Sequence, residues 1–307
     1  MSLVVVLPSR PAWSYFRVMT TAHEGTGSRI LVAGASGVLG RAFIPLAVAA
    51  GHHVTGAARS ARRADTIQRL GAEPVIADAL DRDALTRMMS DVKPAIVVDL
   101  LTDLASGNSA TNARLRIEGT RNLVDAATGA GVERMIAESI SWVYPPGDGV
   151  AHENDPLDLG APEPRLSTIN GVVALEAAVH ELETGVVLRF GQLYGDGTWY
   201  ARDGALADAA RAGKLQATET VTSFIHVDDA ARAISAALDW PAGTWNIVDD
   251  EPAAGTEWAP VFADRVGAPA PEATTSGDVG RPVSNARARA RGLDLRRPSW
   301  RAGFSSL

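Results

Sequence analysis

Between residues 29 and 190, short apolar runs alternate with longer stretches in which apolar residues recur every three or four positions. The short runs, rich in Val, Ile and Ala, cover 29–33, 53–58, 74–77, 95–100, 134–139 and 186–190. The periodic stretches cover 38–50, 61–70, 81–90, 109–130 and 167–184. The runs predict buried strands and the periodic stretches predict helices with one apolar face. Their regular alternation predicts βα units around a parallel sheet, which is an α/β fold.

The pattern becomes less regular after Phe190. We expect a helix at 203–213, a strand near 221–225, a helix at 228–239, a strand near 244–248 and a tail rich in Pro and Gly. These segments are expected to form a smaller lobe over the carboxyl ends of the strands, with some elements returning to the main sheet. Residues 1–28 are expected to lie outside the fold, and Met19 offers an alternative start.

Three glycines at three-residue spacing follow the first predicted strand, in Gly34-Ala-Ser-Gly-Val-Leu-Gly40. A glycine permits the tight turn after the strand, a second lets backbone N–H groups approach a phosphate, and a third lets the helix pack closely. A strand, this turn and a helix in that order predict the dinucleotide site of a doubly wound, Rossmann-type sheet. The contacts expected there are from Gly34, Ser36, Gly37, Val38, Leu39 and Gly40. Residues 29–190 are then the dinucleotide-binding domain and 191–307 mostly a substrate-binding lobe.

The end of the second predicted strand bears on the choice of nicotinamide cofactor. Folds that bind NAD(H) place an acidic residue there to hold the ribose 2′-hydroxyl. This chain has Ala58, followed by Arg59 and Ser60. A guanidinium can hold a 2′-phosphate through two hydrogen bonds, so we expect NADP(H) rather than NAD(H). The alternative is that these residues only begin a basic helix exposed to solvent.

Composition excludes several other classes of function. The chain has 307 residues and a formal net charge of −7, which argues against a nucleic-acid partner. It has no Cys, and the spacing of its six His does not match a metal site, so no metal is expected. No apolar stretch reaches the length of a membrane span. The expected partner is a small-molecule substrate, and a reducing cytoplasm is compatible with the absence of Cys.

Several motifs together resemble the extended short-chain dehydrogenases/reductases of the NAD-dependent epimerase/dehydratase type, over about residues 29–300. They stand in the order of that family: Gly-Ala-Ser-Gly-Val-Leu-Gly at 34–40, Asp78-Ala79, Glu118-Gly-Thr-Arg-Asn-Leu-Val-Asp-Ala-Ala127, Ser139-Ile-Ser-Trp-Val-Tyr144, Leu188-Arg-Phe-Gly-Gln-Leu-Tyr-Gly195 and Phe224-Ile-His-Val-Asp-Asp-Ala-Ala231.

The resemblance implies roles for residues along the cofactor. Asp78 would hold the adenine amino group, and Leu100, Leu101 and Thr102 would line the ribose side. The backbone after Phe190 would face the nicotinamide carboxamide. The remaining implied contacts are Ala79, Ser139, Gly191 and Leu193. In relatives, helices matching 109–130 and 167–184 form a dimer interface, so the chain is expected to be a monomer or a homodimer.

The chain departs from the family where the catalytic pair should stand. The family uses a Tyr and a Lys four residues apart, because an ammonium beside a phenol lowers its pKa and makes it an effective acid and base. Here the two positions hold Thr168 and Val172, and no Tyr or Lys lies between Arg165 and Tyr194. The family's hydroxyl residue is replaced by Ile140, and Arg116 stands where many members have Asn. The chain therefore resembles the atypical branch of the superfamily.

Two hypotheses follow. The first is an NADP-dependent reductase or epimerase-like enzyme with a relocated proton donor, for which Tyr144 is the leading candidate and Ser141 a polarising hydroxyl. Tyr194 and His226 are further candidates for the donor, and each of these aromatic side chains has a purely structural alternative. Substrate contacts are expected from Tyr194, Arg202 and Arg281. The second hypothesis is a protein that binds NADP(H) without chemistry and regulates a partner.

Overall fold

The structure is a computed structural model that describes residues 27–103, 109–275 and 280–307. Its centre is a sheet of seven strands in which every neighbouring pair is parallel. The spatial order is β11 (Gly243–Ile247), β6 (Thr184–Phe190), β5 (Arg134–Ile140), β4 (Ile96–Asp99), β1 (Arg29–Ala33), β2 (His53–Ala58) and β3 (Glu73–Ile76). The predicted α/β fold with a Rossmann-type sheet is therefore confirmed.

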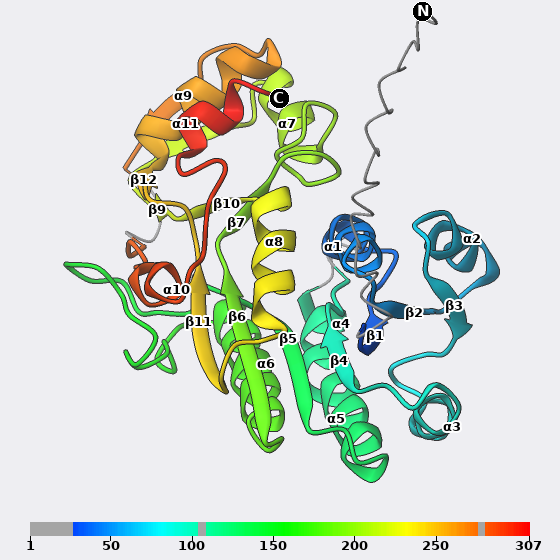
Figure 1. Ribbon diagram of the computed structural model, residues 1–307. Helices are drawn as coiled ribbons and strands as arrows, with labels where there is room; N and C mark the ends of the chain where they lie inside the picture. The colour runs from blue at the N-terminus through cyan, green and yellow to red at the C-terminus, as the bar shows by residue number, and fades with distance from the viewer. Residues whose placement is uncertain (1–26, 104–108, 276–279) are drawn as a thin grey trace, which may run out of the picture.

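Helices cover both faces of this sheet (Figure 1). Alternate residues of each strand point to opposite faces, so Ile30 and Val32 belong to one apolar core and Leu31 and Ala33 to the other. The first core is completed by α1 (Val38–Ala49), α2 (Ala61–Arg69) and α8 (Val227–Ala237). The second is completed by α3 (Arg82–Val92), α5 (Thr120–Gly129) and α6 (Arg165–Val179). Burial on both faces explains the nearly continuous apolar strand sequences.

The segment expected to be one helix at 109–130 has three parts. It consists of α4 (Ser109–Arg114), a π-helical turn η2 (Leu115–Gly119) and α5. A π turn accommodates an extra residue within a helix, and such turns occur frequently at functional sites. The apolar periodicity of a sequence does not resolve this single extra residue.

The later elements gather at one end of the molecule, above the sheet in Figure 1. They include α7 (Ala205–Arg211), α9 (Gly255–Val266) and α11 (Trp300–Phe304), whereas α10 (Ala286–Ala290) packs beside β11 at the edge of the main sheet. This part of the molecule also contains three two-stranded sheets. They pair β7 (Gln192–Tyr194) with β10 (Phe224–His226), β8 (Gln216–Thr218) with β13 (Glu272–Thr274), and β9 (Val221–Thr222) with β12 (Ala253–Ala254).

Aromatic side chains form the core of this lobe. They include Tyr194, Tyr200, Phe224, Phe262 and Phe304, which meet mostly edge to face. The tail rich in Pro and Gly contains α9, a helix that the sequence patterns did not predict and that has Pro260 within it. In the described part of the chain, no helix is both long and apolar enough to span a membrane.

Candidate active site

The glycine turn between β1 and α1 is built as the dinucleotide motif requires. Gly34 has a φ of +78°, and a Cβ on it would lie 2.2 Å from the carbonyl oxygen of Leu100. A Cβ on Gly40 would lie 2.4 Å from the carbonyl oxygen of Ala35. Gly37 is exposed and precedes the first turn of α1, which contains no acidic residue. The N-terminus of α1 therefore presents backbone N–H groups without a side chain in front of them.

The carboxyl end of β2 lies next to this turn, because β2 pairs with β1. The strand ends at Ala58, and both Arg59 and Ser60 are exposed. Ser60 precedes α2, and its side chain makes no capping hydrogen bond to that helix. A guanidinium and a hydroxyl are thus available where the 2′ position of an adenosine ribose would lie.

The residues expected on the adenine side lie after β3 and β4. The Asp78 carboxylate accepts a hydrogen bond from the Leu80 N–H at 3.0 Å, and Asn122 donates to the Ala79 carbonyl oxygen at 3.1 Å. The Leu100 N–H donates to the carbonyl oxygen of Ala33 at 3.0 Å, which holds the end of β4 against β1. The glycine turn, Arg59 and these strand ends fit a dinucleotide cofactor.

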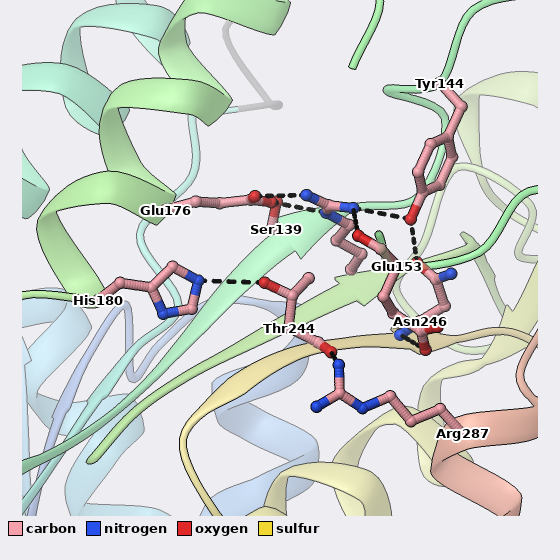
Figure 2. Close-up of polar contacts among 9 residues, drawn as sticks. Ser139, Tyr144, Glu153, Glu176, His180, Thr244, Asn246 and Arg287 are labelled. Carbon is pink, nitrogen blue, oxygen red and sulfur yellow. Dashed lines mark hydrogen bonds and ion pairs between the residues drawn. The ribbon is translucent and has the colours of Figure 1, made fainter. Parts of the chain in front are cut away.

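A buried polar network centred on Arg189 lies between β5, β6, β11 and α6 (Figure 2). Arg189 Nε and Nη2 donate to the two carboxylate oxygens of Glu176 at 2.8 and 2.6 Å. Arg189 Nη1 donates to the hydroxyl oxygen of Tyr144 at 2.7 Å, and that hydroxyl donates to Asn246 Oδ1 at 2.8 Å. Ser139 Oγ donates to Glu176 Oε1 at 2.8 Å.

Two of the predicted site residues, Tyr144 and Ser139, belong to this network. Tyr144 is 3% exposed and its hydroxyl both accepts and donates a hydrogen bond within the protein. Burial raises the pKa of Tyr144, whereas a catalytic phenol needs a lowered one. Ser139 is fully buried against Glu176. Ser141 is also buried, with its N–H donating to the Phe190 carbonyl oxygen at 2.8 Å.

Thr168 and Val172, the positions to which the family resemblance assigns the catalytic pair, lie on α6. Thr168 is half-buried near the start of this helix. Val172 is fully buried in an apolar cluster with Val143 and Ile169. An ammonium at position 172 would have to displace this apolar packing.

The residues expected to bind substrate have other contacts in the structure. The ring of Tyr194 has no exposed surface and packs against Phe224 and His226. Arg202 donates to the carbonyl oxygen of Leu307 at 3.1 Å. Arg281 forms an ion pair with Asp155, with nitrogen and oxygen 2.9 Å apart.

The remaining expected contacts lie at the end of β6. Phe190 is buried, and a Cβ on Gly191 would lie 2.6 Å from the Ser223 carbonyl oxygen. Leu193 is partly buried in β7. Burial lowers the pKa of His226, whose Nδ1 accepts a hydrogen bond from the Asp228 N–H at 3.0 Å.

Sequence reasoning did not assign a role to three ionisable groups at the carboxyl ends of β4 and β5. Asp99 is the last residue of β4, Glu138 lies near the end of β5, and Arg116 lies in the π-helical turn. Burial raises the pKa of Asp99 to about 6 and that of Glu138 to about 7. Burial lowers the pKa of Arg116. A carboxylate inside an otherwise apolar strand run was the available signal for Glu138.

The comparisons with known proteins agree with this architecture. A family model described as the NAD dependent epimerase/dehydratase family matches residues 30–247. A 3-diazoavenalumate denitrifying reductase from a Streptomyces species is 41% identical over 90% of this chain and 99% of its own length. A dTDP-L-rhamnose 4-epimerase from Burkholderia thailandensis is 26% identical over 82% of this chain and 86% of its own length.

Solved structures show the same fold at lower identity. The UDP-glucose 4-epimerase of Thermus thermophilus, in complex with NAD, is 21% identical and superposes with a TM-score of 0.72. That match covers 90% of this chain and 96% of the epimerase. With the glycine turn in place, the doubly wound sheet complete and the family model spanning residues 30–247, the chain belongs to the NAD-dependent epimerase/dehydratase family.

Proposed function

We propose that this chain is an NADPH-dependent reductase that replaces the diazo nitrogen of a small carboxylate substrate with hydrogen. The supporting observation is the combination of an intact glycine turn with Thr168 and a buried Val172 at the positions of the proton-transfer pair. A chain with these features can hold a hydride donor but lacks the family's means of moving a proton. The reductase that is 41% identical acts, by its name, on a diazo compound with loss of nitrogen.

The chemistry of nitrogen loss fits this combination. When bound, NADPH supplies a hydride to the carbon that carries the diazonium group. The new C–H bond takes the hydride electrons, and the electrons of the C–N bond leave with dinitrogen: R–N₂⁺ + NADPH gives R–H + N₂ + NADP⁺. No proton appears in this balance. Reduction of a ketone, by contrast, needs a proton on the developing alkoxide, which is what the Tyr–Lys pair provides.

The protein's own contribution is then binding and orientation. The backbone N–H groups at the start of α1 would hold the pyrophosphate, and Arg59 with Ser60 would hold the 2′-phosphate of NADPH. The Arg189–Glu176 network fixes β5, β6 and α6 relative to one another, so the strand ends that face the nicotinamide are rigid. The apolar packing at Val172 excludes water from that side of the helix.

A direct test mixes the protein with NADPH and an arenediazonium carboxylate such as 4-diazoniobenzoate, and follows the loss of NADPH absorbance. Enzyme-free mixtures give the background, and the Gly40→Ala variant tests dependence on the glycine turn. NADPH carrying deuterium at the transferred position should place one deuterium in the benzoate product, as measured by mass spectrometry. A panel of ketones and enones should be reduced at least a hundredfold more slowly.

The regulatory hypothesis predicts a different result. A chain that only senses NADP(H) would bind NADPH but oxidise it at the enzyme-free rate with every substrate. The absence of the Tyr–Lys pair is equally expected for such a protein. Rates with ketones that match or exceed those with the diazonium substrate would contradict the proposed reaction in another way, because they would require a proton donor.

A further inference from the structure

The carboxyl ends of β4 and β5 bring together two acids and one cation that have no counterpart in the proposed hydride chemistry. Asp99 lies opposite Ala137 in the register of the two strands, so Glu138 is one residue further along β5 and points to the other face of the sheet. Arg116 approaches from the π-helical turn, and its charge interacts with both Asp99 and Glu138. Glu176 also interacts with Arg116, but its carboxylate is already paired with Arg189.

The three side chains differ in how their polar atoms are satisfied. Asp99 accepts hydrogen bonds from the Leu101 N–H at 3.1 Å and from the Thr120 hydroxyl at 2.9 Å. Arg116 is only 3% exposed, yet among the described residues its guanidinium forms no hydrogen bond and no ion pair within 4 Å. The Glu138 carboxylate likewise has no hydrogen-bond partner within the described ranges. A buried charge is normally paired, so the pairing of Arg116 is incomplete, whereas the half-buried Glu138 side chain retains access to solvent.

The topology indicates what would face Glu138. The strand order reverses between β1 and β4, and ligands in such sheets bind outside the carboxyl ends at this reversal. With the pyrophosphate at the start of α1 and the adenosine on the β2 side, the nicotinamide half must extend in the opposite direction. That direction leads over the ends of β4 and β5, where Asp99 and Glu138 lie.

We propose that the Glu138 carboxylate forms the wall of the cofactor site against the nicotinamide ring and favours the oxidised, positively charged ring. This inference rests on the nicotinamide cofactor of the proposed function. A carboxylate stabilises a nearby cation, and burial at the strand end strengthens that interaction. The diazonium substrate carries the positive charge before hydride transfer and the ring carries it afterwards, so one carboxylate serves both states.

The proposal predicts that NADP⁺ binding is linked to the ionisation of Glu138, whereas NADPH binding is not. The dissociation constants of both are measured by calorimetry at pH 6.5, 7.5 and 8.5. Both ligands carry the same 2′-phosphate, so its titration cancels when the two constants are compared as a ratio. We expect the preference for NADP⁺ to increase about threefold from pH 6.5 to 8.5, which corresponds to a pKa of Glu138 lowered by about one unit, from about 7, when NADP⁺ is bound.

Two substitutions separate the site from general charge effects. Glu138→Gln keeps the shape of the side chain and should give a ratio that does not change with pH. Glu183→Gln is the matched control. Glu183 is exposed at the amino end of β6, so this substitution removes the same charge far from the carboxyl ends of the strands. Calorimetry of the wild type in two buffers of different ionisation enthalpy should show more protons released with NADP⁺ than with NADPH, and Glu138→Gln should abolish the difference.

The outcomes distinguish this inference from the cofactor assignment on which it rests. If both ligands bind but their ratio is independent of pH in the wild type, Glu138 does not face the ring and the inference fails. The inference would also fail if the ratio of the two dissociation constants in Glu138→Gln changed with pH as it does in the wild type. If neither NADP⁺ nor NADPH binds at any pH, the proposed function itself fails.

Discussion

The guanidinium of Arg189 on β6 holds both carboxylate oxygens of Glu176 on α6, and the two side chains are 5% and 8% exposed. Glu176 also accepts from Ser139 on β5, and Arg189 reaches Tyr144 after that strand. One ion pair therefore ties two neighbouring strands to the helix that covers them. This is the part of the sheet whose carboxyl ends would face the nicotinamide and the substrate.

Glu176→Gln should destabilise the protein strongly. The substitution leaves the Arg189 guanidinium buried without its counter-charge, which typically costs about 3–5 kcal/mol of unfolding free energy. Denaturation by urea measures the change. The control is Glu118→Gln, because the Arg114–Glu118 pair is more than half exposed and should contribute less than about 1 kcal/mol. Equal effects of the two substitutions would show that the buried pair is not an anchor.

Tyr144→Phe distinguishes a structural tyrosine from a proton donor. The hydroxyl bridges Arg189 and Asn246, so its removal should lower the unfolding free energy by about 1–3 kcal/mol. Turnover of the diazonium substrate should change by less than about tenfold, with the same pH profile. A loss of about 10²–10⁴-fold in turnover at unchanged stability would instead identify Tyr144 as the general acid suggested by the sequence. Ser141→Ala extends the test to the expected polarising hydroxyl.

Arg59→Ala should weaken NADPH binding while leaving NADH binding nearly unchanged. Only NADPH has a 2′-phosphate, and loss of a charge-assisted pair with it should raise the dissociation constant at least tenfold. Calorimetry with both cofactors gives the two constants. Arg87→Ala is the matched control, because Arg87 is exposed on α3 and its loss changes net charge equally. Equal affinity of the wild type for NADPH and NADH would contradict the expected preference.

The sequence predicts the frame of this molecule well because both faces of the sheet are buried. Strands β1, β4 and β6 are then compact apolar runs, and the glycine spacing is set by backbone geometry that only glycine satisfies. The π-helical turn was not predictable, since one extra residue in a helix barely alters apolar periodicity. Helix α9, which contains Pro260, was not predicted either.

The candidate site was predictable only in part. The motif at 139–144 draws attention to Tyr144, but a motif does not reveal that the hydroxyl is enclosed between Arg189 and Asn246. Asp99 and Glu138 lie far apart in sequence, and only the pairing of β4 with β5 brings them to one edge of the sheet. Charge interactions of this kind depend on strand register, which a single sequence does not encode locally.

Asp249→Asn should alter how stability depends on pH. Asp249 is 1% exposed, and burial raises its pKa to about 8. A carboxyl group that binds its proton more tightly when folded contributes stability that is lost as pH rises from about 4 through about 8. The variant should therefore lose less stability than the wild type between pH 5 and pH 8, as measured by urea denaturation. Asp148→Asn, at an exposed loop position, should leave the dependence unchanged.

The position of the Arg116 side chain depends on the number of residues in the π turn. Successive residues of an α-helix are rotated by about 100°, so deleting Ile117 would convert the turn to ordinary helix and rotate the residues before it by that angle. The apolar faces of α5 and the sheet would remain in register, while the guanidinium would leave Asp99 and Glu138. A single-codon deletion could thus remove the cation from the sheet edge without exchanging any of the three charged residues.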